Sequence, residues 1–182
     1  MKTCWECGEK LQVIKGEPYH YTESGLDNVY LHGIIQYKCA KCMEGGPEIP
    51  NIQELHLLIG SLVICKRLPL TAQEIKYLRK ELGQKSKDMA ELLAVTPQEY
   101  SKWENARDII SRNYDKSLRM LYILNAESKV GKVLHKGIRF TMGMASIKQP
   151  VKKPEDIKID ITASEWIRPF EEPIFSEECV RA

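Results

Sequence analysis

The stretch that decides the fold runs from Thr71 to Glu104 and reads TAQEIKYLRKELGQKSKDMAELLAVTPQEYSKWE. It opens with a capping box, in which the Thr71 side chain is expected to accept a hydrogen bond from a free backbone amide while Glu74 reaches back. Three apolar residues then recur at helical spacing, namely Ile75, Leu78 and Leu82. Gly83 follows as the residue that ends a helix in the left-handed conformation, so the sequence predicts a helix that ends at Leu82.

Two shorter helices are predicted next, separated by a turn at residues 94–95. The first spans about Ser86 to Leu93, and its inward residues are expected to be Met89, Leu92 and Leu93. The second begins at Thr96, because threonine is favoured at the N-cap and Pro97 suits the first helical position. Helical spacing separates its two faces, with Tyr100 and Trp103 inward and Gln98, Ser101 and Lys102 outward.

Two short helices joined by a three-to-four-residue turn are typical of the helix-turn-helix, whose second helix reads bases in the DNA major groove. Gln98 suits adenine and Lys102 suits guanine, because their polar groups match those that these bases present. Basic residues around this face are expected to hold phosphates. The predicted DNA-binding set is Gln98, Ser101 and Lys102, with Ser86, Lys85, Lys87, Arg107 and Arg112 around them.

The charge distribution favours an anionic partner for the middle third of the chain. Residues 66–136 carry fifteen Lys/Arg and nine Asp/Glu, a balance of +6. Residues 1–50 carry five and seven, and residues 151–182 carry five and eight, so both ends are acidic. Positive charge concentrated in one segment is where DNA would bind. A solvated charged face on an ordinary all-α bundle is the alternative that this count leaves open.

Three segments carry a family resemblance. Residues 78–80 (LRK), 86–96 (SKDMAELLAVT) and 101–104 (SKWE) resemble the Cro/repressor-type (XRE) helix-turn-helix. The resemblance implies an ion pair between Arg79 and Glu104, so we interpret Glu104 as structural rather than catalytic. Two residues depart from the family: Ala94 replaces the usual glycine, which strains a left-handed backbone, and Ser86 replaces a frequent glutamine.

Four of the six cysteines form two Cys-x-x-Cys pairs, Cys4 with Cys7 and Cys39 with Cys42. Each short loop can turn two thiolates toward one point, and two loops together supply the four sulfur ligands that Zn²⁺ prefers at about 2.3 Å. Disulfides are disfavoured in a chain without an export signal, so paired cysteines are better interpreted as metal ligands. We therefore predict one structural zinc ion held by all four residues.

Three alternatives to this zinc site stay open. A Cys-x-x-Cys pair can be redox active, and His20 or His32 could replace one thiolate ligand. The third alternative is a catalytic zinc ion, which needs an open coordination position that four thiolates would close.

Strand-forming segments lie between the two cysteine pairs, at Leu11–Ile14, Tyr19–Tyr21, Val29–Leu31 and Ile34–Tyr37. Short strands within residues 1–50 bury too little surface to be stable alone. A bound metal is therefore expected to supply folding energy to this unit.

The order of the two units is more specific than either motif. A Cys-x-x-Cys…Cys-x-x-Cys strand unit, a linking helix and an XRE helix-turn-helix together resemble the MqsA/YgiT-type zinc-finger antitoxins over roughly residues 1–125. The run from Val29 to Cys39 is also similar to the run before that family's second cysteine pair. The resemblance implies a homodimeric repressor that binds a palindromic operator in double-stranded DNA, while its zinc unit contacts a partner toxin.

The remaining segments are assigned by periodicity and composition. Helix-period runs predict a linking helix over 51–66, with Cys65 in the core, and another helix from Ser111 to Leu124. Apolar residues alternate with polar ones over 157–162, which predicts a half-buried strand within an acidic, aromatic-dotted tail. This tail could dock on its own dimer, bind a partner, mask the basic face or stay disordered. Cys179 is interpreted as a free thiol.

These patterns predict an α+β multidomain chain. Its expected parts are a small zinc-stabilised strand domain at 1–50, a linking helix at 51–66, an all-α five-helix helix-turn-helix domain at 67–126, and a connector with an acidic C-terminal tail at 127–182. No apolar run approaches the roughly 18 residues of a membrane span, and the start lacks the apolar core of a signal peptide. We therefore expect a cytoplasmic protein without a membrane partner.

An enzyme is the weakest interpretation of these residues. The sequence contains no Ser/His/Asp set and no phosphate-binding glycine loop, and Glu54 beside His56 is too isolated for an acid–base pair. The prediction is a transcriptional regulator and not an enzyme. The alternative is an adaptor whose zinc domain binds a protein while the helices bind no specific DNA sequence.

Overall fold

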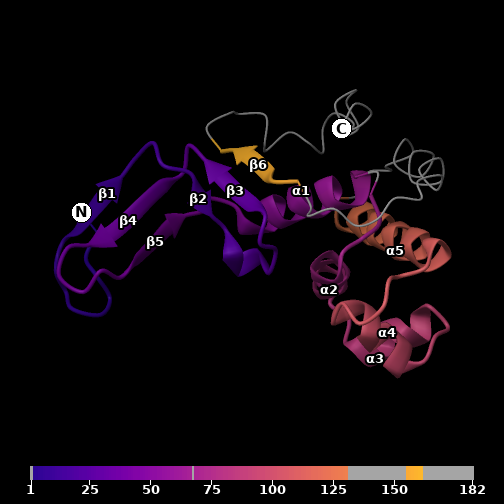
Figure 1. Cartoon of the computed structure of the whole chain (residues 1–182). Coiled ribbons are helices and arrows are strands. Elements are labelled where there is room, and N and C mark those ends of the chain that lie inside the picture. The colour runs from indigo at the N-terminus through magenta and orange to yellow at the C-terminus, as the bar shows by residue number, and fades with distance from the viewer. Residues whose placement is uncertain (1, 67, 131–154, 162–182) are drawn as a thin grey trace.

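The structure is a computed structural model that describes residues 2–66, 68–130 and 155–161. Within these ranges the chain forms six strands and five α-helices, which is a mixed α+β architecture. Figure 1 shows β1, β4 and β5 at one end of the molecule, helices α2–α5 at the other, and α1 between them. No helix in the described ranges is long and apolar enough to cross a membrane.

The first sheet is antiparallel and has the strand order β1-β4-β5. Its strands are β1 (Leu11–Ile14), β4 (Ile35–Cys39) and β5 (Gly45–Glu48). The sequence does not predict β5, because two glycines and Pro47 disfavour a strand. An edge position tolerates the proline, and a Cβ at Gly45 would overlap the backbone of Tyr37, so only glycine allows this close pairing.

The second sheet joins segments from both ends of the chain. Its order is β2-β3-β6, with β2 (Tyr19–His20) antiparallel and β6 (Ile157–Asp160) parallel to β3 (Val29–His32). The strand predicted from the alternation over 157–162 is therefore present, and it lies against the N-terminal part of the chain. Of the predicted connector and tail at 127–182, residues 127–130 belong to a helix instead, and residues 131–154 and 162–182, including Cys179, lie outside the described residues.

The five α-helices of the described residues are α1 (Ile52–Cys65), α2 (Ala72–Glu81), α3 (Ser86–Leu92), α4 (Pro97–Glu104) and α5 (Arg112–Val130). Two of them, α2 and α4, begin at the predicted caps Thr71 and Thr96. Thr71 and Glu74 make both bonds of the capping box, and the Thr96 hydroxyl accepts from the Glu99 amide at 3.2 Å. Helix α5 continues past the predicted end at Leu124, because residues 125–129 contain no helix breaker and Ala126 is buried in the core.

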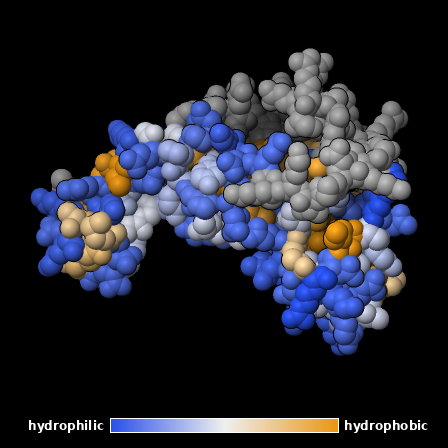
Figure 2. All heavy atoms as spheres, in the orientation of Figure 1, coloured by the Kyte–Doolittle hydropathy of each residue, from blue (hydrophilic) through white to orange (hydrophobic). Residues whose placement is uncertain are grey.

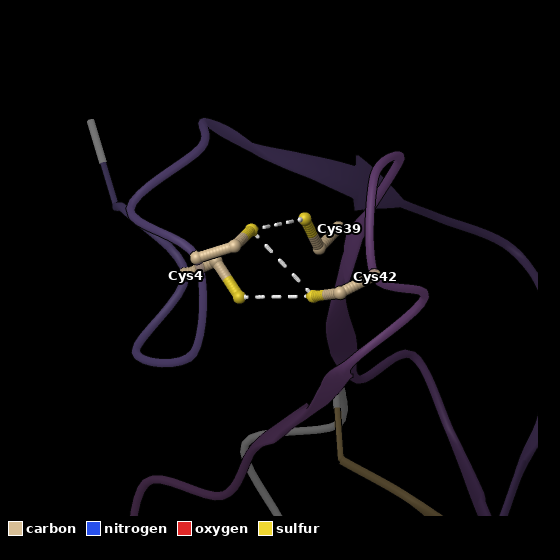
Figure 3. Close-up of side chains that lie close together, drawn as sticks. Cys4, Cys39 and Cys42 are labelled. Carbon is tan, nitrogen blue, oxygen red and sulfur yellow. Dashed lines mark hydrogen bonds between the residues drawn. The ribbon is translucent and has the colours of Figure 1, made fainter.

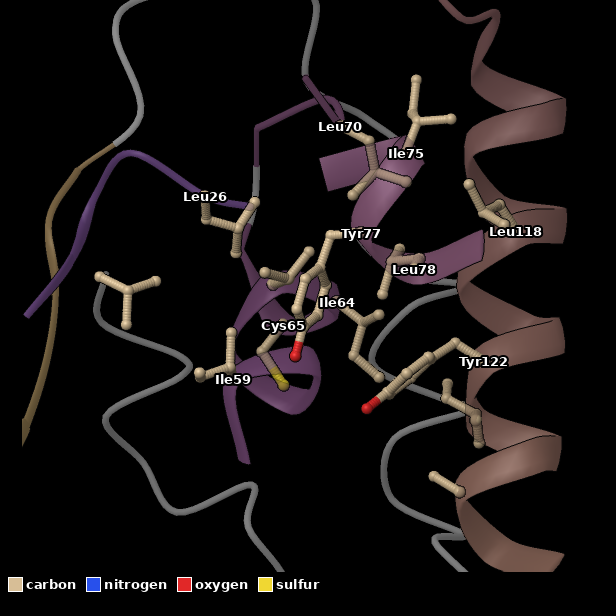
Figure 4. Close-up of a cluster of buried hydrophobic side chains, with 14 of the residues drawn as sticks. Leu26, Ile59, Ile64, Cys65, Leu70, Ile75, Tyr77, Leu78, Leu118 and Tyr122 are labelled. Carbon is tan, nitrogen blue, oxygen red and sulfur yellow. The ribbon is translucent and has the colours of Figure 1, made fainter. Parts of the chain in front are cut away.

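One continuous apolar core connects the strands to the helices, and Figure 4 shows a part of it. Leu31 of β3, Leu55 of α1 and Leu118 of α5 are each fully buried in this cluster. Helices α1 and α5 approach closely at Gly60, where a Cβ would overlap the Tyr122 ring and hydroxyl. Cys65 is buried in the same core, as predicted.

One predicted core residue points outward. Leu92 was expected to face inward with Met89 and Leu93, but its side chain is 57% exposed. The inward stripe is formed by Met89 and Ala90 of α3 and by Leu93 directly after it, which places Leu92 at the margin of this stripe.

The turn between α3 and α4 contains the backbone strain that the sequence suggested. Ala94 has a φ of +54°, in the left-handed region that glycine adopts more readily. The Val95 amide still donates to the Ala90 carbonyl at 2.9 Å, so the turn closes α3 despite this cost.

Replacing Ala94 with glycine should raise the free energy of unfolding by about 1 kcal/mol, because glycine lacks the steric cost of this conformation. Ala126→Gly, in the helical interior of α5, is the control and should lower it by about 1 kcal/mol or more. Urea unfolding of both variants measures the difference. A lower stability for Ala94→Gly would contradict the left-handed turn.

Candidate metal centre and candidate nucleic-acid interface

The four paired cysteines converge on one point. The Sγ atoms of Cys4 and Cys42 lie 3.4 Å apart, those of Cys7 and Cys39 lie 3.5 Å apart, and those of Cys7 and Cys42 lie 3.6 Å apart. Figure 3 shows the sulfur atoms facing one another from the two loops. All four lie within 4.8 Å of one another, and a tetrahedral ion with metal–sulfur bonds of about 2.3 Å would separate them by about 3.8 Å. The cluster can therefore hold a metal ion.

The two cysteine loops have the same backbone conformation. The Gly8 amide donates to the Cys4 carbonyl at 3.0 Å, and the Met43 amide donates to the Cys39 carbonyl at the same distance. Gly8 and Met43 both have a positive φ, of 71° and 64°. Each loop thus makes an equivalent tight turn, and this turn directs its two thiols toward the other loop.

Electrostatics at the cluster favour a bound cation. Backbone amides of Cys42 and Lys41 donate to the Cys39 sulfur and lower the pKa of Cys39 to about 7. The Glu44 amide acts in the same direction on Cys42, but burial and the neighbouring thiols raise the pKa of Cys42 to about 12. Four thiols this close cannot all ionise by themselves, whereas a divalent cation deprotonates the thiols that bind it.

Neither histidine that could have replaced a cysteine joins this cluster. The His20 ring stacks on Tyr30 at 4.6 Å, and its Nε2 lies 2.8 Å from the Asp27 carbonyl oxygen. Among the described residues, the metal-binding group consists of four cysteines without His32 or any other histidine.

Helix α4 separates a buried face from an exposed one. Tyr100 and Trp103 are buried, and the centroid of the Trp103 ring lies 5.8 Å from that of Tyr100 and 5.1 Å from that of Tyr114. The outward residues of the prediction are all exposed, namely Gln98, Ser101 and Lys102. Side chains that could meet a nucleic acid therefore project from a helix that is anchored from behind.

The surroundings of α4 present basic groups to solvent. Of the residues expected around this helix, Lys85, Lys87, Arg107 and Arg112 are exposed and Ser86 is half-buried. Within residues 68–130, eight Lys/Arg side chains are exposed against three Asp/Glu. Figure 2 shows a largely hydrophilic surface over α3 and α4 in this view. The exposed charge of the helical region is thus predominantly positive.

The ion pair implied for the end of α4 is formed. Arg79 Nε donates to Glu104 Oε1 at 2.6 Å, and Arg79 Nη1 donates to the Gln84 carbonyl at 2.9 Å. The Glu104 side chain is only 8% exposed, so its charge is neutralised inside the fold. This bond fixes α4 to α2 and leaves Glu104 with a structural contact.

Sequence reasoning missed a half-buried polar cluster around His56. His56 Nδ1 lies 2.8 Å from Glu81 Oε1, and His56 Nε2 lies 2.8 Å from the Tyr21 hydroxyl. His56 of α1 thus contacts Glu81 of α2, 25 positions away, and Tyr21, which follows β2 and lies 35 positions away. No local spacing signals such a contact, and Glu54, the sequence neighbour of His56, is not its acidic partner.

Comparison with protein families, with curated proteins and with solved structures finds no match for this chain. The arrangement of its own residues therefore carries the functional argument.

Removing Arg79 should be costly, because Glu104 would remain buried without its partner. We expect Arg79→Met to lower the free energy of unfolding by about 3 kcal/mol. The double variant Arg79→Met/Glu104→Leu should lose less than Arg79→Met alone, since no unpaired charge remains. Chemical unfolding of the single and double variants tests this, and strictly additive losses would show that the two residues are uncoupled.

Proposed function

We propose that this chain is a sequence-specific DNA-binding transcriptional regulator, a repressor in which α3 and α4 form a Cro/repressor-type helix-turn-helix. The proposal rests on one observation: α4 exposes Gln98, Ser101 and Lys102 while Tyr100 and Trp103 anchor it from behind. In the proposed complex α4 enters the major groove and these three side chains meet base edges. Lys85, Lys87, Arg107 and Arg112 hold phosphates on either side.

We propose Zn²⁺ as the ion of the four-cysteine cluster. Four thiolates match the ligand preference of zinc and close its coordination shell, so the ion's chemistry is structural and no reaction is assigned to it. The β1-β4-β5 sheet needs such support, because Cys39 is the only buried residue of its three strands.

The finer form of the proposal is an antitoxin of the MqsA/YgiT type, working in the cytoplasm. Such a regulator is a homodimer whose two copies of α4 read the halves of a palindromic operator. Its zinc unit contacts the partner toxin. The order of a four-cysteine strand unit before a helical unit supports this form.

A specific observation also favours the second candidate, a protein-binding adaptor. Large apolar side chains are exposed at the strand end of the molecule, namely Trp5 (67%), Val13 (50%), Ile35 (41%) and Met43 (61%). These are four of the eight large apolar side chains that are exposed in the described residues, and exposed apolar side chains that gather in one region are typical of protein interfaces. An adaptor would use this region and bind no specific DNA.

Selection of bound duplexes from a random pool separates the two candidates. A regulator should enrich one recurring sequence, and the triple variant Gln98→Ala/Ser101→Ala/Lys102→Ala should enrich none. A folded chain that enriches no sequence even at low salt would favour the adaptor.

Purified protein should contain one zinc ion per chain. Cys39→Ser should lose that ion and destabilise the strand unit, whereas the core variant Cys65→Ser should keep it. Metal analysis and circular dichroism before and after chelation measure both effects. Full zinc content in Cys39→Ser would contradict the assignment.

Base-reading and phosphate-holding residues should differ in a binding assay. We expect Lys102→Ala to reduce the difference in binding free energy between specific and random duplexes, by roughly 1–3 kcal/mol. Arg112→Ala should weaken binding to specific and random duplexes alike, by a similar or smaller amount. Affinity should also fall steeply with salt, because counterions are released from DNA. Equal losses on specific and random DNA for Lys102→Ala would remove it from the base-reading set.

A further inference from the structure

Strand β6 meets β3 across a large separation along the chain. Asn28 and Glu155, which are hydrogen bonded, lie 127 positions apart. The pairing is parallel and runs from Val29 opposite Ile157 to His32 opposite Asp160. Figure 1 shows β6 lying alongside β3. Residues 155–161 therefore meet the strands as a separate extended segment and not as part of a hairpin.

The edge of β3 holds this segment through its main chain. The Ile157 amide donates to the Asn28 carbonyl at 2.6 Å, and the Ile161 amide donates to the His32 carbonyl at 2.9 Å. The Asn28 side-chain amide donates to the Glu155 carbonyl. Asn28 is only 5% exposed, so its amide would lose a buried hydrogen bond if the segment left. These bonds reach main-chain atoms that every extended peptide carries.

Side-chain selectivity comes from three alternate positions. Ile159 is 4% exposed and belongs to the apolar core, and Ile157 and Ile161 pack half-buried against that core. The intervening Lys158 and Asp160 are exposed. The edge thus selects aliphatic side chains at every second position, while the side chains between them are exposed to solvent.

We propose that the edge of β3 is a peptide-binding site for an extended segment with alternating aliphatic side chains, and that residues 155–161 are its ligand within the same chain. The proposal does not depend on DNA binding. A partner protein that presents such a strand, parallel to β3, binds here by displacing residues 155–161. Because the internal ligand belongs to the same chain, it competes with a free peptide as an intramolecular partner.

A cleavable chain tests this site. A site-specific protease sequence is inserted between residues 140 and 141 of the full-length protein, and a fluorescent peptide of residues 153–163 is added before and after cutting. The peptide should exchange into the cut chain. Its affinity for the uncut chain should be at least about 100-fold lower. An Ile159→Asp peptide should bind at least about tenfold more weakly, whereas a Lys158→Asp control peptide should bind normally.

Three results would overturn the proposal. The first is a cut chain that stays folded by circular dichroism and accepts no peptide. The second is loss of the folded signal when the segment is displaced, because β6 would then be an integral strand and not a ligand. The third is equal binding of the native and Ile159→Asp peptides, which would remove the side-chain selectivity.

Discussion

A buried ion pair fixes the junction on which the rest of the molecule depends. Arg119 and Asp115 of α5 are 4% and 8% exposed, and their side chains are 2.6 Å apart. Arg119 also donates to the carbonyls of Ile64, Lys66 and Leu68, while Asp115 accepts from the Leu70 amide. These bonds satisfy carbonyls at and after the end of α1, and they offset the cost of burying a cation. The junction sets how α1, which packs with the strands, meets the helical region.

The contacts that stabilise the helices and the residues proposed to bind DNA lie on different faces of the helical region. The close approach of α1 and α5 at Gly60 and the pairing of Arg79 with Glu104 hold the helices from inside. The proposed base-reading residues Gln98 and Lys102 lie on the opposite, exposed side of α4. If this surface binds DNA as proposed, its side chains can be replaced to change the sequence preference without unfolding the protein, because they are not needed for packing.

Local signals in the sequence predicted much of the fold. The capping box at Thr71, the Thr96–Pro97 start of α4 and the cysteine spacings act over a few residues, and each predicts a local structure correctly. The remainder depends on contacts between distant residues. Neither the pairing of β6 with β3 nor the bonds of Arg119 to the end of α1 follows from periodicity, and β5 lacks strand-forming residues altogether. The exposed Leu92 shows that an apolar residue near a helical stripe need not belong to it.

The central claim is that the outer face of α4 lies against DNA bases. Photo-crosslinking from a benzophenone amino acid at position 101, in complex with a duplex obtained by selection, measures this most directly. Position 73, exposed on α2 and on the side that contacts Asp27, is the matched control. The account predicts crosslinks to bases in the major groove from position 101 and none from position 73. Crosslinks from position 73 alone, in a complex that still forms, would contradict it.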